Sequence, residues 1–172
     1  MKELKQSIIE TPLGEMLAIG DEEALYLLEF ADCKKTAKKI DHLLVKLQAN
    51  IVSGTAESLD LIETELKSYF KGSLKEFKTP IKLVGSSFQN KVWNSLMQIP
   101  FGTTRSYRDI ACTTGNIQAF RAAANANGAN KLAIIIPCHR VINSNGQLGG
   151  YAGGIFRKKY LLQHESELIN AF

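Results

Sequence analysis

The sequence predicts an α/β chain of two parts, an N-terminal part of strands followed by helices and a mostly helical C-terminal part. Alternating hydrophobic residues occupy the opening segments, apolar residues at helical spacing follow them, and the charge changes sign midway. Residues 1–84 carry 12 Lys against 14 Asp and Glu, whereas residues 85–172 carry nine Lys and Arg against three acids. We therefore expect one domain at residues 1–82 and a second at residues 83–172.

The sequence of the first part predicts three strands and two helices. In order, we expect strands at residues 5–10, 16–20 and 25–30, helices at residues 34–47 and 56–70, and an extended segment at residues 77–81. Pro12-Leu13-Gly14 forms the first turn, and Gly72 can end the second helix. The strands thus form an antiparallel meander before the chain turns helical.

The second part predicts helices joined by short turns. In order, we expect a helix capped by Ser86 or Ser87 and ended near Pro100, a short helix from Ser106, a helix from Ile117 to about Asn127 that Asn116 can cap, a short buried strand or extended run at residues 134–136, and a helix at residues 156–169. Ser106 and Asp109 match a capping box with Asp in place of Glu. Two short helices around Gly115-Asn116 resemble a helix-turn-helix.

Composition favours an ordinary globular protein. Hydrophobic content is 45% and charged content 22%, and no apolar run of about 18 residues could span a membrane. The N-terminus lacks the pattern of a secretory signal. Three widely spaced cysteines indicate free thiols in a reducing compartment, so we expect a cytoplasmic protein. The basic second part indicates a polyanionic partner, although a solvated basic face explains the charge equally well.

The run Ile136-Pro137-Cys138-His139-Arg140-Val141 carries the strongest candidate chemistry. A cysteine nucleophile reacts as the thiolate, which needs a nearby base or positive charge. His139 and Arg140 offer both, and Arg105, Arg108 and Arg140 could also contact phosphates. The alternative is a buried structural cysteine.

The terminal helix places a carboxylate among apolar residues. Leu161, Glu165 and Leu168 share one face at spacings i, i+4 and i+7. A carboxylate there needs a partner to offset its desolvation. His139 is a candidate, which would give a Cys–His–Glu relay. The alternative is that Glu165 reaches water from the edge of the apolar stripe.

Residues Pro137 to Val141 resemble the active-site signature of the O6-alkylguanine-DNA alkyltransferase (methylated-DNA–protein-cysteine methyltransferase) family. Further similar positions, in the family's order and spacing, are Phe101-Gly102, Ser106-Tyr107, Arg121, Asn130, Tyr151 to Gly154, and Glu165. The resemblance implies a ribonuclease-H-like N-terminal α/β domain and a mostly helical, winged helix-turn-helix C-terminal domain. It implies direct-reversal DNA repair, in which an alkyl group moves irreversibly from O6-alkylguanine to Cys138, with O4-alkylthymine as a further candidate substrate.

The same resemblance implies roles for individual residues. Cys138 accepts the alkyl group, His139 deprotonates it through a water, and Glu165 orients His139. Asn130 braces the turn, and Tyr107 supplies a proton to the departing base and helps to rotate the nucleotide out. Arg121, Ser106, Ala122, Ala123 and Asn125 are expected to contact DNA, with Arg121 filling the vacated place in the base stack, and Val141, Tyr151, Ala152 and Gly153 to form the pocket wall. The alanine-rich residues 119–126 permit close approach to DNA, although the alanine content alone favours the alternative, tight helix packing.

The implied partner is double-stranded DNA containing alkylated bases, bound by a monomer without a cofactor or membrane. We expect no metal, because the first part offers only Cys33 and His42, fewer than the four ligands of the zinc site found in some family members. Other members carry a hydroxyl residue at the position of Ala152, where here only backbone could bond the lesion. Cys112 is expected to be a buried apolar residue of the helix-turn-helix.

Three other functions fit parts of the sequence. A protein that recognises lesions without repairing them fits the second part, but such proteins replace the acceptor cysteine. A thiol hydrolase would use Cys138, His139 and Glu165, yet it would leave Tyr107 and Arg121 unexplained. A transcription factor fits the basic helix-turn-helix and leaves Cys138 unexplained. Turnover separates the enzyme classes, because a hydrolase cycles whereas an alkyl acceptor stops after one event.

Overall fold

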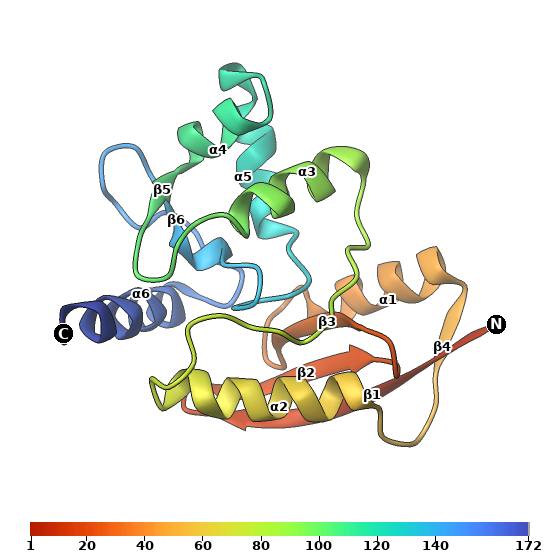
Figure 1. The fold of residues 1–172 in the computed structure, drawn as a ribbon. Helices are drawn as coiled ribbons and strands as arrows, with labels where there is room; N and C mark the ends of the chain where they lie inside the picture. Colours follow the sequence, from red (N-terminus) through yellow and green to blue (C-terminus); the bar gives the residue numbers. More distant parts are fainter. Residues whose placement is uncertain (172) are drawn as a thin grey trace. The chain divides into compact units, whose positions relative to one another are not determined.

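A computed structural model describes residues 1–171, and the chain divides into two compact units, Met1–Val84 and Gly85–Phe172 (Figure 1). The division falls two residues after the boundary expected at residue 82. We describe each unit separately. No helix within residues 1–171 is both long enough and apolar enough to cross a membrane.

The first unit contains a four-stranded mixed sheet. Its strands are β1 (Lys2–Thr11), β2 (Gly14–Gly20), β3 (Leu25–Phe30) and β4 (Ala49–Ile51), in the spatial order β3-β2-β1-β4. The first three strands pair antiparallel, as expected, and the unpredicted β4 pairs parallel with β1. Gly14 closes the first turn with a φ of 107°, in the left-handed region that favours glycine.

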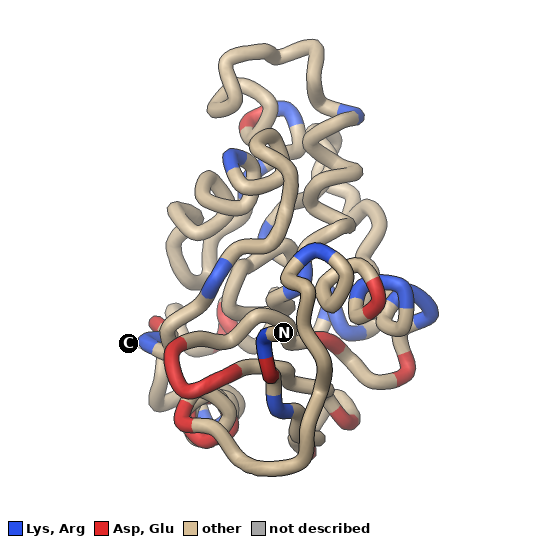
Figure 2. Tube along the Cα trace, turned by 90° about the vertical axis from the view of Figure 1, so that its right-hand side faces the viewer, with Lys and Arg blue, Asp and Glu red and all other residues tan. Residues whose placement is uncertain are grey.

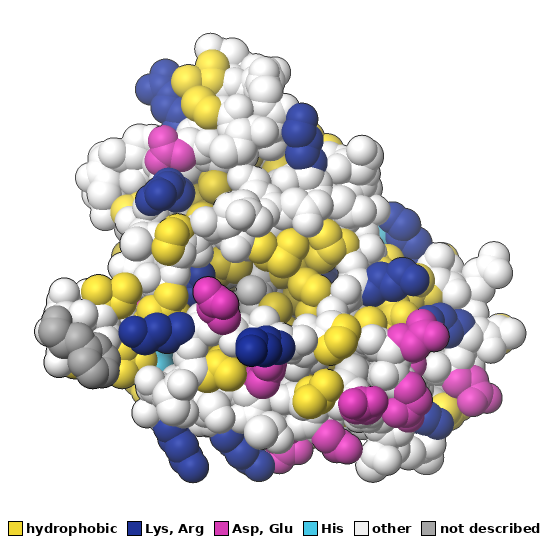
Figure 3. Space-filling model, in the orientation of Figure 1, with side chains coloured by type: hydrophobic (Ala, Val, Ile, Leu, Met, Phe, Trp, Pro, Cys, Tyr) yellow, Lys and Arg dark blue, Asp and Glu magenta, His cyan; other side chains and the backbone are white. Residues whose placement is uncertain are grey.

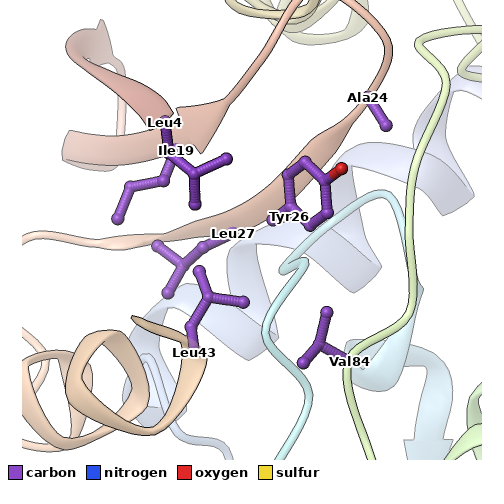
Figure 4. Close-up of a cluster of buried hydrophobic side chains, with 7 residues drawn as sticks. All are labelled: Leu4, Ile19, Ala24, Tyr26, Leu27, Leu43 and Val84. Carbon is purple, nitrogen blue, oxygen red and sulfur yellow. The ribbon is translucent and has the colours of Figure 1, made fainter. Parts of the chain in front are cut away.

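Two helices, α1 (Thr36–Leu47) and α2 (Glu57–Phe70), pack on this sheet. Figure 4 shows Leu43 of α1 facing Leu4, Ile19 and Leu27, which come from three different strands. All four side chains are fully buried. The apolar stripe that predicted the first helix therefore supplies one side of the core of this unit.

The second unit is mainly helical, as predicted. Its elements are α3 (Ser87–Leu96), β5 (Arg105–Ser106), α4 (Tyr107–Thr113), the 3-10 turn η1 (Ile117–Ala119), α5 (Phe120–Gly128), the 3-10 turn η2 (Cys138–Arg140), β6 (Val141–Ile142) and α6 (Ile155–Asn170). Helices α3, α4 and α5 pack against one another, and the indole of Trp93 donates a hydrogen bond to the Ala126 carbonyl at 2.8 Å. The capping box of Ser106 and Asp109 is confirmed, with bonds of 2.8 and 3.0 Å.

A short parallel ladder between β5 and β6 joins two distant segments of the second unit. Arg105 pairs with Val141, and Ser106 pairs with Ile142. Tyr107 follows β5 directly, and the turn η2 precedes β6 directly. The ladder therefore brings the start of α4 next to the segment that carries Cys138.

The structure contradicts the strand expected at residues 134–136 and the burial expected of Cys112. Residues 134–136 form a tight turn and not a strand, with the Ile136 N–H donating to the Leu132 carbonyl at 2.9 Å. Within this turn Ile134 is buried and has a φ of 71°, which is rare for a β-branched residue. Cys112 is exposed, because α4 buries the neighbouring Ile110 and Ala111 instead.

Candidate active site

Cys138 begins the turn η2, directly after Pro137. Its backbone N–H donates to the Ile136 carbonyl at 2.7 Å, and the residue is only 5% exposed. The proline ring restricts the preceding backbone. The thiol is therefore held on a stiff, largely buried segment.

Asn130 braces this turn through its buried side-chain amide. Its Nδ2 donates to the Ile136 carbonyl at 2.9 Å and to Cys138 Sγ at 3.2 Å, while its Oδ1 accepts from the Leu132 N–H at 2.9 Å. A hydrogen bond donated to sulfur favours the thiolate, because an anion is the stronger acceptor. Asn130 thus orders the turn and stabilises negative charge on the sulfur.

His139 and Glu165 are both completely buried and in direct contact. His139 Nε2 lies 2.8 Å from Glu165 Oε1 and donates to it, since a carboxylate only accepts. Burial lowers the pKa of His139 although the carboxylate opposes this effect, so the ring is neutral at pH 7. Nδ1 then carries the lone pair, and within residues 1–171 it has no hydrogen-bond partner. The ring can therefore accept a proton at Nδ1.

Glu165 also binds Arg140 through both of its oxygens. Arg140 Nε donates to Oε2 at 2.8 Å and Nη2 to Oε1 at 2.9 Å, while Nη1 donates to the Ile99 carbonyl at 2.7 Å. Burial alone would raise the pKa of Glu165, but His139 and Arg140 together outweigh burial and hold that pKa far below its usual range. The expected phosphate contact of Arg140 is wrong, because its guanidinium is buried and engaged within the protein.

Tyr107 begins α4 and approaches the loop before α6. Its hydroxyl lies 3.4 Å from the Gly150 carbonyl. Burial raises the pKa of Tyr107, and negative charge on Cys138 raises it further, so the hydroxyl keeps its proton at neutral pH. A Cβ atom at Gly149 would lie 3.2 Å from the tyrosine ring, so the glycine permits this close approach.

Lys158 is a buried residue of this site that the sequence analysis missed. Its Nζ donates to the carbonyls of Val141, Leu148 and Gly150 at 2.5–3.1 Å. Burial lowers its pKa to about 8, although negative charge on Cys138 opposes the shift. Lys158 therefore fastens two backbone segments of the site and places a cation near the sulfur.

A sequence signal for Lys158 did exist. Lys158, Leu161 and Glu165 lie at i, i+3 and i+7 on α6, and all three are fully buried. The buried stripe of α6 thus begins with a lysine and contains a carboxylate. Lysine is almost never fully buried without partners, so its place on that stripe could have indicated a set of acceptors.

The expected pocket wall lies on two segments. Val141 is fully buried at the start of β6, whereas Tyr151, Ala152 and Gly153 lie in the loop just before α6. Tyr151 and Ala152 are half-buried, and Gly153 is buried. Because Lys158 bonds the carbonyls of Val141 and Gly150, it connects the backbones of both segments.

The residues expected to contact DNA separate into exposed and buried ones. Arg121, Ala122 and Asn125 are exposed on α5, and Ser106 is half-buried at the cap of α4. Ala123 is 0% exposed and faces the helical core, so the DNA contact expected of its side chain is wrong. The small side chain of Ala123 serves helix packing.

The exposed end of the helix-turn-helix combines basic and apolar side chains. Figure 3 shows such side chains together at the upper end of the second unit. Arg121 lies 5.8 Å from the ring centroid of Phe120, and Phe120 is 43% exposed. In Figure 2, acidic positions gather in the first unit, and the second unit carries mostly basic ones. These features fit a polyanionic partner for this end.

Metal binding finds no support in the part of the chain that the structure describes. Within residues 1–171, no three His, Cys, Asp or Glu side chains gather into a possible metal site. The expectation of a protein without metal stays a prediction.

Two sequence families match the two units. Residues 4–83 match the ribonuclease-like domain of 6-O-methylguanine DNA methyltransferase, and residues 87–167 match the DNA binding domain of 6-O-methylguanine DNA methyltransferase. Together the matches cover almost the whole chain. The expected ribonuclease-like first domain and DNA-binding second domain are thereby confirmed as the fold class.

Whole-length relatives agree with these matches. A methylated-DNA–protein-cysteine methyltransferase of Methanosarcina acetivorans is 41% identical over 92% of this chain and 96% of its own length. The constitutive methylated-DNA–protein-cysteine methyltransferase of Bacillus subtilis is 39% identical over 84% of each chain. The crystal structure of Mycobacterium tuberculosis OGT in complex with DNA is 36% identical, with a TM-score of 0.80 over 96% of this chain and 94% of that one.

Proposed function

The chain belongs to the 6-O-methylguanine DNA methyltransferase family, and we propose that Cys138 is the residue that receives the alkyl group. The protein repairs alkylated DNA by direct reversal, through transfer of the alkyl group to a cysteine of its own. The surroundings of Cys138 carry the assignment. Among the three cysteines it alone is buried, and it lies beside the buried pair of His139 and Glu165.

Proton removal is the first step that the site supports. The Cys138 S–H proton passes through a water to Nδ1 of His139, whose Nε2–H stays bonded to Glu165. The imidazolium that forms is stabilised by the adjacent carboxylate. Asn130 and Lys158 supply a donor and a cation near the sulfur, which favour the thiolate. The neutral, buried imidazole is suited to act as the base.

Displacement at carbon follows. The thiolate attacks the alkyl carbon, a sulfur–carbon bond forms, and the bond from that carbon to O6 of guanine breaks. Its electron pair stays on the purine, and the Tyr107 hydroxyl gives a proton to the departing base. Because burial raises the pKa of Tyr107, the hydroxyl still holds its proton when the base leaves.

Access to the lesion requires that the nucleotide leave the base stack, since the target atom is shielded inside a duplex. We assign Arg121 to the vacated place, with Ala122, Asn125 and Ser106 as further contacts to DNA. The exposure of Arg121, Ala122 and Asn125, and the partial exposure of Ser106, support these assignments.

We also propose that O4-alkylthymine is a second substrate. A cytoplasmic location is proposed from the three free thiols.

A single turnover follows from the chemistry, because a thioether has no good leaving group and water does not reverse it. Protein incubated with an excess of duplex DNA containing O6-methylguanine should remove one methyl group per molecule and then stop. Cys138→Ala should bind the same duplex and remove none. Removal of several methyl groups per molecule would contradict the proposal and favour a hydrolytic thiol enzyme.

A further inference from the structure

The side chain of Asn127 has no part in the steps described above, and we propose that it positions the acceptor thiol. The proposal rests on the assignment of Cys138 as the acceptor. Asn127 lies in the last turn of α5 and is only 5% exposed. Its Nδ2 donates to the backbone carbonyl of Cys138 at 3.3 Å.

A buried asparagine is a poor choice for packing alone. The other buried side chains of α5 are the small apolar ones of Ala123 and Ala126. Asn127 Oδ1 is buried, and no group within residues 1–171 donates a hydrogen bond to it. An unsatisfied amide oxygen destabilises the folded state, whereas an apolar side chain of equal size would not. The Asn127 amide donates a hydrogen bond to Cys138, which a leucine side chain could not do.

Two asparagines hold Cys138 at different atoms. Asn130 bonds the sulfur, and Asn127 bonds the carbonyl. The carbonyl bond holds the peptide plane after Cys138, and the bond from the Cys138 N–H to the Ile136 carbonyl holds the plane before it, so together they limit the direction of the Cα–Cβ bond. In the displacement, sulfur must approach in line with the bond that breaks, and a misplacement of about 1 Å can cost about 10²-fold in rate.

A residue that only positions the Cys138 thiol should affect the reaction differently from a residue that helps to deprotonate it. The bond from Asn127 reaches neither His139 nor Glu165, so proton removal from the thiol should not depend on it. Loss of this bond should slow the transfer step, which needs one direction of approach. It should not slow a small reagent that can reach the sulfur from several directions.

Asn127→Leu tests the proposal, because leucine keeps the size of the side chain and removes both the donor and the unsatisfied oxygen. Its limiting rate of transfer should fall about 10- to 100-fold, equally for free O6-benzylguanine and for O6-methylguanine in duplex DNA. Its affinity for unmodified duplex, the pH profile of its reaction with iodoacetamide and its melting temperature should not fall.

Asn90→Leu is the matched control. Asn90 also has a buried, unsatisfied side-chain oxygen in the second unit, but it lies on α3, where its backbone N–H donates to the Ser86 carbonyl at 2.9 Å. It should transfer alkyl groups at the wild-type rate. Asn127→Met is a second apolar replacement for the case in which the leucine variant folds poorly.

Either of two results would overturn the proposal. One is a wild-type limiting rate in a folded Asn127 variant. The other is a loss confined to duplex DNA, which would place the effect in DNA contact and not at the thiol. Failure of the proposed function gives a different result, because wild-type protein would then carry no alkyl group on Cys138.

Discussion

Glu165 accepts hydrogen bonds from three groups that lie far from it in sequence, namely His139, Arg140 and the Gly102 N–H. The sequence could predict that a carboxylate on an apolar stripe needs a partner, and it indicated His139. It could not reveal Arg140 as the second partner, because a basic residue next to the nucleophile is equally suited to bind phosphate. Only the fold decides which direction that side chain takes.

Glu165→Gln should impair both activity and stability. The amide cannot accept from all of these donors, and it leaves the buried Arg140 charge without its counter-ion. We expect the free energy of unfolding to fall by about 3–5 kcal/mol. The reaction of Cys138 with free O6-benzylguanine should slow by about 10²-fold at neutral pH. Chemical denaturation and single-turnover kinetics measure these effects.

The pH dependence distinguishes a relay from a structural carboxylate. The difference in rate between Glu165→Gln and the wild type should decrease as the pH rises toward about 8.5, where a thiol ionises without a neighbouring base. Protein stability should also depend on pH. In the wild type, the pKa of Glu165 is lower in the folded state than in the unfolded state, so the ionised carboxylate stabilises the folded protein above about pH 4.3. This stabilisation is lost as the pH falls below that value. Glu167→Gln is the control, because Glu167 is exposed on the same helix. An unaltered rate and pH profile would remove Glu165 from the relay.

Helix α6 contributes to the site from two positions that lie two turns apart on one buried stripe, because Glu165 bonds His139 and Lys158 bonds the carbonyl of Val141 in the pocket wall. Its expected bounds, residues 156–169, lie within one residue of the observed ones. The acceptors of Lys158 could not be predicted, because they are backbone carbonyls of segments whose paths depend on the loop and on the ladder of β5 and β6.

Lys158→Met keeps most of the side-chain length but removes the ammonium group. Without its three hydrogen bonds, the loop at residues 148–154 should exchange its amide protons faster, and transfer from free O6-benzylguanine should slow by about tenfold. Because the pKa of Lys158 is about 8, the difference from wild type should diminish above that pH as the cation is lost. Lys159→Met, at an exposed neighbouring position, should behave as wild type. Equal rates for both variants would refute this role.

Helix α5 exposes Arg121 at its first turn and buries Asn127 at its last. If Arg121 fills the vacated place in the stack, Arg121→Ala should slow repair of O6-methylguanine in duplex DNA by roughly tenfold or more, since unstacking costs a few kcal/mol. The rate on free O6-benzylguanine should not change, and affinity for unmodified duplex should fall less than the repair rate. Arg108→Ala, on the exposed face of α4, is the control for general phosphate contact. Equal losses on both substrates would show that Arg121 does not act on the stack.

At the scale of the whole molecule, local sequence patterns predict most of the helices and strands, but they do not predict the pairing between segments that are distant in the sequence. Strands β1 to β3 and the helices show in the hydrophobic spacing of their own residues. Strand β4 is three residues long and includes the polar Asn50, so only its parallel pairing with β1 identifies it. Three successive isoleucines favour extended backbone and so predict a strand at residues 134–136, whereas the bonds of Asn130 hold a turn there.

The most direct test of the account is to locate the transferred group. Protein incubated with duplex DNA containing O6-methylguanine should gain the mass of one methyl group, and peptide mapping should place that group on Cys138. Cys138→Ala should gain none. A methyl group on Cys33 or Cys112, or DNA that loses its methyl groups while the protein mass stays unchanged, would contradict the account.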